Sequence, residues 1–167
     1  IELANKHPRV NIHKPGIGVG GHCIPVDPYF LIEKINHKKS IISMSREVNI
    51  NQEFHILEKI LAKILKNKDK ENIYFYGLTY KANVGDFRES PALRIVKDLS
   101  KIDLNKQIFA IDPFLKEDKH EGNISFKRKV FFQNNSLIFI MISHLDFKNY
   151  INIIDKNKKN IEIIDLT

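Results

Sequence analysis

One glycine-rich stretch places a thiol and a carboxylate close together. Residues 15–28 read Pro-Gly-Ile-Gly-Val-Gly-Gly-His-Cys-Ile-Pro-Val-Asp-Pro and hold four of the seven glycines and the single cysteine, Cys23. Glycine serves where the backbone must take a positive φ or approach another molecule closely. A solitary thiol beside such a turn, with Asp27 four residues later, is typical of a nucleophile presented to a bound substrate. The alternative is an inert cysteine buried beside a tight loop, because free cysteine is among the most buried residue types.

A histidine and an arginine precede this stretch and could hold an anion. Pro8 stands between His7 and Arg9 and disfavours a helix there. We therefore expect an extended lead-in over residues 1–14, with both side chains on one side of the backbone because they are two residues apart. The alternative is a pair of solvated side chains without a ligand.

A second loop carries polar side chains that could bind a small molecule. It spans residues 79–89 and follows the apolar run 73–78, which predicts a buried strand. Ser90 and Pro91 then supply an N-cap and a first helical residue, so a helix begins directly after the loop. The chemically useful side chains of the loop are Tyr80, Lys81, Asp86 and Arg88. The alternative for the two cationic side chains is an ordinary ion pair with an acidic neighbour in the same loop.

The first element that must position these loops is a long helix. Apolar residues recur at helical spacing from about 40 to 65 without an intervening proline or glycine, which predicts one amphipathic helix. A kink would fall at the amide-rich residues 49–51. A helix of about 25 residues spans roughly 38 Å. Such a helix often links two domains or forms a subunit interface. A short apolar helix ending at Ile35 is expected before it.

The second element is an α/β unit over residues 73–167. The expected strands are 73–78, 107–111, 124–126, 137–142 and 161–166, with helices after residue 90 and from 146 to 151. Continuous apolar strands alternating with helices predict a parallel sheet covered on both faces. Such sheets bind ligands at the carboxyl ends of their strands, where the loop 79–89 leaves the first strand.

Composition argues against several other classes of protein. The chain has 167 residues, a net charge of +7 and an isoelectric point near 9.4. The lysines are scattered among turns rather than gathered on one helix with aromatic residues, so we expect no nucleic-acid partner. The longest apolar run, 137–142, is far shorter than the ~18 residues of a membrane helix, so we expect no membrane contact. One cysteine forms no internal disulfide, which fits a reducing cytoplasm.

Common cofactor motifs are missing from the sequence. The glycine run 16–21 lacks the strand-to-helix context of a dinucleotide-binding turn, and no Walker sequence occurs. No cysteines and histidines have zinc-ligand spacing, so we expect no metal. The opening residues 1–5 include neither methionine nor a signal-peptide pattern, and we expect the chain to begin within a longer protein.

Two ordered motifs resemble those of the UDP-glucose/GDP-mannose dehydrogenase family, the nucleotide-sugar 6-dehydrogenases. Residues 15–31 resemble the family's catalytic-cysteine loop. Gly-Leu-Thr-Tyr-Lys at 77–81, followed by Asp-Phe-Arg-Glu-Ser-Pro-Ala at 86–92, resembles the signature of its carboxy-terminal UDP-binding domain. The run Ala-Asn-Lys-His-Pro-Arg-Val-Asn-Ile at 4–12, with Gly-Gly-His-Cys at 20–23, is most similar to the branch that oxidises UDP-N-acetylmannosamine. The resemblance covers nearly the whole chain.

The resemblance implies oxidation of the sugar C6 alcohol to a carboxylate, with two NAD⁺ per turnover. The first hydride transfer gives an aldehyde, to which the cysteine thiolate adds as a thiohemiacetal. The second hydride transfer gives a thioester, which water hydrolyses. A tethered thiol keeps the aldehyde from escaping. Thiolate is the reactive form, so Cys23 needs polar surroundings.

The resemblance also implies roles for individual residues. Cys23 is the nucleophile, and Asp27 helps to position or activate a water or an alkoxide. The residues expected to contact the UDP-sugar are His7, Arg9, Gly20, Tyr80 and Lys81. The first two of these reach the substrate of a neighbouring subunit, which implies a homodimer or a larger homo-oligomer. Arg88 is expected to reach the NAD cofactor.

This chain departs from the family pattern at both ends. The N-terminal NAD-binding domain is absent, as are a lysine and an asparagine that assist catalysis, and the chain stops before a further substrate-contacting basic residue. We therefore expect a carboxy-terminal piece that turns nothing over alone. Its expected parts are a catalytic-cysteine loop (1–36), a linking and dimerisation helix (37–72) and a Rossmann-like UDP-binding α/β domain (73–167).

Two other functions remain open. One is a UDP-N-acetylglucosamine or UDP-glucose 6-dehydrogenase, which differs only in the sugar. The other is a non-catalytic nucleotide-binding or assembly module that has kept the fold.

Overall fold

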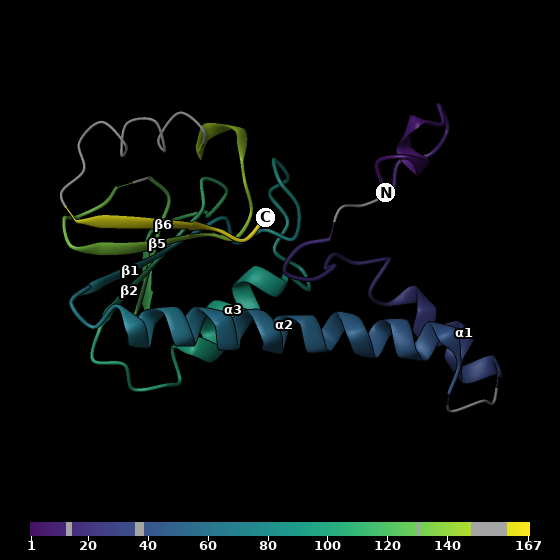
Figure 1. The fold of residues 1–167 in the computed structure, drawn as a ribbon, viewed down its shortest axis with the longest axis horizontal. Coiled ribbons are helices and arrows are strands. Elements are labelled where there is room, and N and C mark those ends of the chain that lie inside the picture. The colour runs from purple at the N-terminus through teal and green to yellow at the C-terminus, as the bar shows by residue number, and fades with distance from the viewer. Residues whose placement is uncertain (13–14, 36–38, 130, 148–159) are drawn as a thin grey trace.

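The fold joins a six-stranded sheet to one long helix (Figure 1). The structure is a computed structural model and describes residues 1–12, 15–35, 39–129, 131–147 and 160–167. Its elements are η1 (Ala4–Lys6, a 3₁₀ turn), α1 (Asp27–Ile35), α2 (Ile41–Lys66), β1 (Asn72–Tyr76), α3 (Pro91–Leu99), β2 (Gln107–Ile111), β3 (Lys119–Glu121), β4 (Ile124–Lys127), β5 (Ser136–Ile140) and β6 (Ile161–Asp165).

The strands of the sheet follow the order β3-β4-β2-β1-β5-β6. Every neighbouring pair is parallel except β3 with β4. The central strands β1 and β5 are buried along their whole length, as expected for a parallel sheet covered on both faces. These features confirm the predicted α/β class, a long helix followed by a Rossmann-like sheet.

The edge of the sheet contains a strand that the sequence did not predict. Strand β3 pairs antiparallel with β4 through a turn at Gly122, whose φ is +58°. The three residues of β3 are polar and largely exposed, so they show no apolar alternation that would reveal a strand. The helix expected at 146–151 begins with a helical turn at 145–147, and its remainder lies outside the described residues.

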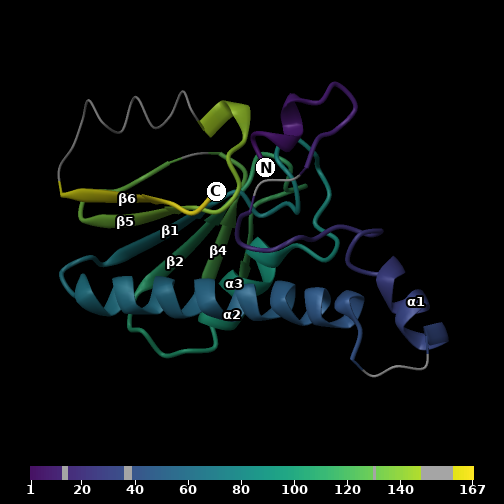
Figure 2. The ribbon, with the colours of Figure 1, turned by 45° about the vertical axis from the view of Figure 1, so that its right-hand side comes forward.

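Helices α2 and α3 cover one face of the sheet (Figure 2). This side of the core is aliphatic, and its fully buried members include Ile60 and Ile64 of α2 and Leu99 of α3. The opposite face is aromatic, because Tyr74 stacks on Phe109 with ring centroids 4.8 Å apart. The two cores pack on opposite faces of the sheet, and the loops at its carboxyl edge therefore start from fixed positions.

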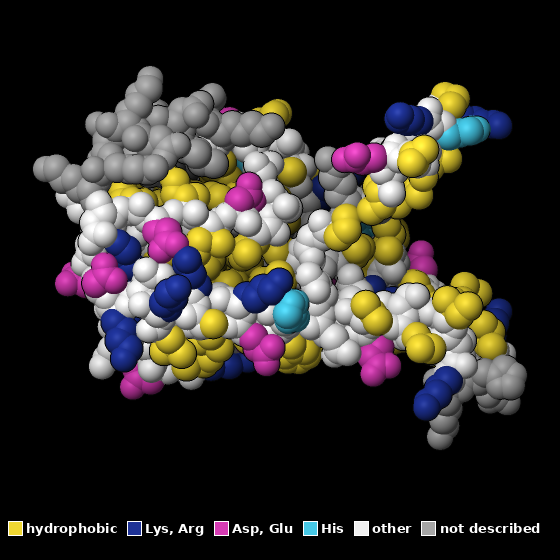
Figure 3. Space-filling model, in the orientation of Figure 1, with side chains coloured by type: hydrophobic (Ala, Val, Ile, Leu, Met, Phe, Trp, Pro, Cys, Tyr) yellow, Lys and Arg dark blue, Asp and Glu magenta, His cyan; other side chains and the backbone are white. Residues whose placement is uncertain are grey.

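Helix α2 is continuous for 26 residues, as predicted, and residues 49–51 remain helical. Ser40 caps it, with its hydroxyl accepting from the Ser43 backbone N–H at 3.1 Å. The carboxyl-terminal half packs on the sheet, whereas the amino-terminal half extends beyond it and leaves Ile41 85% and Val48 68% exposed. In Figure 3, apolar side chains gather at this end, over α1 and the start of α2.

The segment before the glycine stretch corrects one prediction. Residues 7–10 form a turn rather than an extended chain, because the Val10 backbone N–H donates to the His7 carbonyl at 3.0 Å. Pro8 occupies the second position of this turn, where its fixed φ is favourable. The Asn5 side chain closes the segment through hydrogen bonds in both directions with the Ile12 backbone, at 2.6 and 3.0 Å.

Within the described ranges, no helix is long and apolar enough to cross a lipid bilayer.

Candidate functional site

A cavity of about 670 Å³ lies between the glycine-rich stretch, helix α2 and the carboxyl edge of the sheet. Its walls are mainly apolar, with a few polar groups that converge on the space, as is usual for small-molecule sites. The lining residues come from Pro15–Gly20 with Ile24, from Ser45, Val48, Asn49 and Gln52 of α2, from Tyr80–Ala82 after β1, from Met141–Ser143 after β5, and from Thr167.

Helix α2 anchors one side of the glycine-rich stretch. The Val19 N–H donates to the Asn49 side-chain oxygen at 2.7 Å, and the Asn49 amide nitrogen donates to the Val19 carbonyl at 3.2 Å. One turn further along, the Gln52 amide nitrogen donates to the Gly16 carbonyl at 2.9 Å. The sequence suggested a kink near Asn49, but these amides instead serve as a template for the loop. The sequence feature that could have indicated this anchoring role is the cluster of amide side chains, which interrupts the apolar face of the helix.

The loop between β1 and α3 supports the other side of the stretch. A Cβ at Gly20 would overlap the Glu89 carbonyl oxygen and lie 2.6 Å from the Pro91 Cδ atom. Gly21 has a φ of +96°, and a Cβ there would lie 2.9 Å from the Tyr80 ring. These two glycines therefore let the backbone rest directly on the second loop.

Cys23 is exposed at the rim of this contact. Its Sγ atom lies 2.9 Å from the His22 Nδ1 atom, and the His22 ring meets the edge of the Tyr80 ring with centroids 6.5 Å apart. The cavity lining includes Gly20 and Ile24 but not the cysteine itself. The sulfur is thus neither sealed in the core nor inside the cavity, and lies beside one of its walls.

Asp27 follows Cys23 by one helical turn. Its backbone N–H donates to the Cys23 carbonyl at 2.8 Å, and the residue opens α1. The carboxylate is exposed. The turn over residues 23–27, which leads into α1, therefore sets the backbone separation of Cys23 and Asp27.

Tyr80 and Lys81 both line the cavity. The Tyr80 N–H donates to the Asp86 carbonyl at 3.1 Å and closes the loop on itself. Lys81 is exposed and forms no ion pair within the described part of the chain.

Arg88 is engaged by its own loop. Its Nε and Nη2 atoms donate to the Asp86 carboxylate at 3.1 and 2.6 Å. These charge-assisted hydrogen bonds lower the pKa of the Asp86 carboxyl to about 2. The ion pair that the sequence allowed as an alternative therefore forms, although the Arg88 side chain is still 65% exposed.

A buried polar cluster that sequence reasoning missed lies beneath the loop. Asp112 follows β2 and is fully buried, and its Oδ2 atom accepts from the Leu78 N–H at 2.7 Å and from the Thr79 N–H at 3.2 Å. The His144 Nε2 atom lies 3.1 Å from the same carboxylate oxygen. The only signal was the position of Asp112 directly after a strand, because the contact with His144 depends on the order of strands in the sheet.

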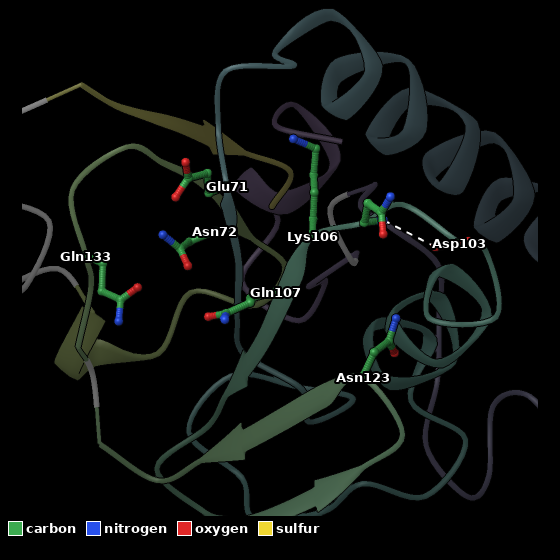
Figure 4. A pocket seen from close by; sticks show the side chains of 8 residues that line it. Glu71, Asn72, Asp103, Lys106, Gln107, Asn123 and Gln133 are labelled. Carbon is green, nitrogen blue, oxygen red and sulfur yellow. Dashed lines mark hydrogen bonds between the residues drawn. The ribbon is translucent and has the colours of Figure 1, made fainter.

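A second hollow lies at the opposite, amino edge of the sheet (Figure 4). It measures about 750 Å³ and is lined by polar residues that include Asn72 and Gln107, the first residues of β1 and β2. None of the residues predicted to do chemistry lies there. Because the hollow lies at the amino edge, the length of the strands separates it from the glycine-rich stretch at the carboxyl edge.

The structure thus gathers some of the predicted site residues and leaves others apart. Gly20, Tyr80 and Lys81 share the cavity, and Cys23 lies next to it. His7 and Arg9 belong to residues 1–12, which stand away from the sheet (Figure 1) and contribute nothing to the cavity lining. No group of three or more acidic, histidine or cysteine side chains in the described residues is placed to bind a metal ion.

Comparison with known families gives matches over both halves of the chain. The UDP-binding domain of the UDP-glucose/GDP-mannose dehydrogenase family matches residues 74–167, and the central domain of the same family matches residues 1–53.

Individual proteins give the same result. The chain is 43% identical over 150 residues to the UDP-N-acetyl-D-mannosamine dehydrogenase of Methanocaldococcus jannaschii, which covers 90% of this chain and 33% of that protein. It is 38% identical over 170 residues to the enzyme of that name from Methanococcus vannielii, covering 99% and 38%. The UDP-N-acetyl-mannosamine dehydrogenase Cap5O of Staphylococcus aureus superposes with a TM-score of 0.72 at 36% identity, covering 99% and 38%. The chain therefore spans between 33% and 38% of the length of these relatives.

Proposed function

Because the chain belongs to the UDP-glucose/GDP-mannose dehydrogenase family, we propose that it is the cysteine-loop and UDP-binding part of a nucleotide-sugar 6-dehydrogenase. The complete enzyme oxidises the C6 alcohol of a UDP-sugar to a carboxylate, with NAD⁺ as the hydride acceptor. The favoured substrate is UDP-N-acetylmannosamine, and the uronate product serves the synthesis of a surface polysaccharide.

One observation carries this proposal. An exposed thiol lies beside a cavity that is shared by a glycine-rich loop and a loop that carries Lys81, which forms no ion pair among the described residues. A cavity of about 670 Å³ falls within the usual range of ~300–1,000 Å³ for small-molecule sites. Lys81 supplies a positive charge for the diphosphate, and Tyr80 lines the same cavity and contacts the ring of His22, which precedes Cys23.

Cys23 acts at the aldehyde stage of the reaction. Its thiolate adds to the aldehyde carbon, so a C–S bond forms and the carbonyl oxygen becomes an alkoxide that takes up a proton. The second oxidation converts this thiohemiacetal into a thioester, and water then cleaves the C–S bond to release the carboxylate and the thiol. His22, whose Nδ1 atom lies 2.9 Å from Sγ, is placed to exchange the thiol proton, and Asp27 orients the water.

The described residues do not form a site for the whole NAD cofactor. In this sheet, residues 77–90 connect β1 to α3 in place of a tight glycine turn, and the amino end of α3 is already capped by Ser90 and Pro91. When bound, NAD⁺ would supply the hydride acceptor for each oxidation, and Arg88 is the residue of this chain that would contact it. The rest of the cofactor site belongs to a dinucleotide-binding domain outside these residues.

The proposed sugar is inferred from the names of similar proteins. Two archaeal proteins and one bacterial structure named for UDP-N-acetylmannosamine match 90% or more of this chain. Related proteins named for N-acetylgalactosaminuronic acid match at 33–40% identity. The alternatives are therefore other UDP-sugars with the same C6 alcohol, including UDP-N-acetylglucosamine and UDP-glucose.

The active unit is a homodimer or a larger homo-oligomer. His7 and Arg9 lie away from the cavity of their own chain, which supports their contribution to the cavity of a neighbouring subunit. The exposed apolar face at the start of α2 supports an interface there, since Ile41 and Val48 are largely uncovered. In this proposal residues 1–36 carry the catalytic loop, 37–72 link and dimerise, and 73–167 bind UDP.

The cellular location follows from the thiol. An exposed, unpaired cysteine that must react as a thiolate needs a reducing compartment, so we place the enzyme in the cytoplasm.

Turnover by the complete polypeptide tests the proposal. UDP-N-acetylmannosamine, UDP-N-acetylglucosamine and UDP-glucose would each be supplied with NAD⁺, and the product analysed by mass spectrometry. We expect two NADH per uronate formed and the highest kcat/KM for UDP-N-acetylmannosamine. The Cys23→Ser variant should lose formation of the uronate. UDP binding without NAD⁺ reduction for any of the three sugars would favour the non-catalytic module instead.

A further inference from the structure

One buried histidine joins three segments at the carboxyl edge of the sheet. His144 is 1% exposed and follows β5. Its ring contacts Asp112, which follows β2, and both ends of the segment 79–83, which follows β1. It is absent from the cavity lining, whereas Tyr80 and Lys81 between those two ends are part of it.

The hydrogen bonds fix the tautomer of this ring. The Asn83 backbone N–H donates to the Nδ1 atom at 2.9 Å, and a backbone N–H has no acceptor role, so Nδ1 carries no hydrogen. The hydrogen therefore resides on Nε2, which lies 3.1 Å from the Asp112 Oδ2 atom and 3.3 Å from the Thr79 hydroxyl oxygen. The His144 ring is thus a donor on one side and an acceptor on the other.

The segment held in this way has its own internal constraints. The Thr79 hydroxyl donates to the Lys81 carbonyl at 2.9 Å. Asn83 adopts a φ of +60°, which asparagine tolerates better than most residues, and its side-chain oxygen accepts from the Leu145 N–H at 2.9 Å. The segment is therefore pinned to the chain after β5 by two reciprocal hydrogen bonds, one of which ends on His144.

We propose that His144 is a positioning residue for the UDP-sugar, because its Nδ1 atom holds the segment 79–83 in the conformation that presents Tyr80 and Lys81 to the cavity. This inference rests on the proposed function. The Nε2 side of the ring serves a different purpose: it satisfies the buried Asp112 carboxylate and thereby stabilises the sheet edge. The Nε2 atom also lies 3.3 Å from the Thr79 hydroxyl, so the Nδ1 contact with Asn83 is the one that serves the segment alone.

Two substitutions of similar size separate the two sides of the ring. In His144→Asn, the side-chain oxygen takes the place of Nδ1 and keeps an acceptor for Asn83. In His144→Gln, the amide nitrogen takes the place of Nε2 and keeps a donor for Asp112, but the acceptor for Asn83 is lost. His144→Asn leaves the buried Asp112 carboxylate without the ring donor, so we expect its melting temperature to fall further than that of His144→Gln, which keeps this donor.

The experiment measures UDP affinity by calorimetry, and KM and kcat for the UDP-sugar, in the complete polypeptide. We expect His144→Gln to weaken UDP binding about five- to tenfold and to raise KM by the same factor with kcat nearly unchanged, because a ground-state contact is lost. His144→Asn, which keeps an acceptor for Asn83, should retain most of the wild-type UDP affinity. A purely structural role would instead lower the active fraction, and hence kcat, most in His144→Asn, the less stable variant.

Several results would overturn the inference. Equal UDP affinity of the wild type and a folded His144→Gln variant would do so, as would equal loss in both variants. If His144→Gln does not fold, Thr79→Val replaces it: we expect weaker UDP binding from the loss of the hydroxyl bond to Lys81, with Thr79→Ser as the matched control, and unchanged binding rejects the role of the segment. A wild-type protein that binds no UDP would instead refute the proposed function.

Discussion

The side-chain amide of Asn49 pairs with the backbone of Val19 in both directions, at 2.7 and 3.2 Å. The Asn49 side chain thus pairs with both the N–H and the carbonyl group of one loop residue, as the backbone of a neighbouring β-strand would. The glycine-rich stretch has no secondary structure of its own between residues 15 and 26, so its path depends on such external bonds. The long helix is thus a scaffold for the loop as well as a connection between two parts of the chain.

Replacing Asn49 tests this role. We expect Asn49→Ala to lower kcat of the complete polypeptide about tenfold, because the loop that carries Cys23 loses its register on α2. The loss of stability should be about 1 kcal/mol, the usual contribution of one or two partly exposed hydrogen bonds. The control is Asn51→Ala, since Asn51 is exposed on the same helix. Steady-state kinetics and urea denaturation give both quantities, and equal kinetics in the two variants would contradict the scaffold role.

The close approach of Gly20 to the second loop predicts a steric cost. In Gly20→Ala the new Cβ overlaps the Glu89 carbonyl, and the backbone must shift, which we expect to destabilise the protein by about 1–3 kcal/mol. In Gly16→Ala the new Cβ has no atom within 4 Å, so we expect little change in stability. Thermal and urea unfolding of the two variants provide the comparison. A Gly20→Ala protein as stable as Gly16→Ala would show that the loops do not touch.

Alkylation tests the exposure of the thiol. Cys23 is the only cysteine of these 167 residues, so its labelling by iodoacetamide is read as the difference between the complete polypeptide and its Cys23→Ser variant. We expect rapid labelling of the native complete polypeptide and at least severalfold slower labelling when a UDP-sugar fills the adjacent cavity. Cys23→Ser provides the blank. A thiol that reacts only after unfolding by urea would mean that the sulfur is enclosed, and the nucleophile role would fail.

The ion pair between Asp86 and Arg88 predicts a titration at low pH. Pairing lowers the pKa of the Asp86 carboxyl from its ordinary 3.8 to about 2, so the folded state binds this proton less readily than the unfolded state. The stabilisation is complete above about pH 4 and is lost as the pH falls towards 2. Carboxyl ¹³C NMR should give a midpoint about 2 for the wild type and a higher midpoint in Arg88→Gln, still below the ordinary value because the backbone N–H of residue 88 continues to donate to this carboxylate. An unchanged midpoint in the variant would rule out the pair.

The sequence predicted those elements whose signals are local. Ser90 followed by Pro91 marked the start of α3, and apolar runs marked the buried strands β1, β2 and β5. These signals are reliable because a cap or a buried strand is decided by a few neighbouring residues.

The features that were missed depend on the folded arrangement. The turn at His7 requires a hydrogen bond that Pro8 alone does not imply, since proline is equally common in extended chain. The contact between Asp112 and His144 exists only because β5 lies beside β1, which lies beside β2. No spacing along the chain reveals such a pair.

The contact of Gly20 with Glu89 also bears on protein engineering. A chimera that exchanges only residues 74–167 between two relatives would put a foreign surface beneath the cysteine loop, although the exchange leaves both matched domains intact. We therefore expect functional swaps to require residues 15–28 together with the sheet, because Gly20 and Gly21 lie directly against Glu89 and Tyr80.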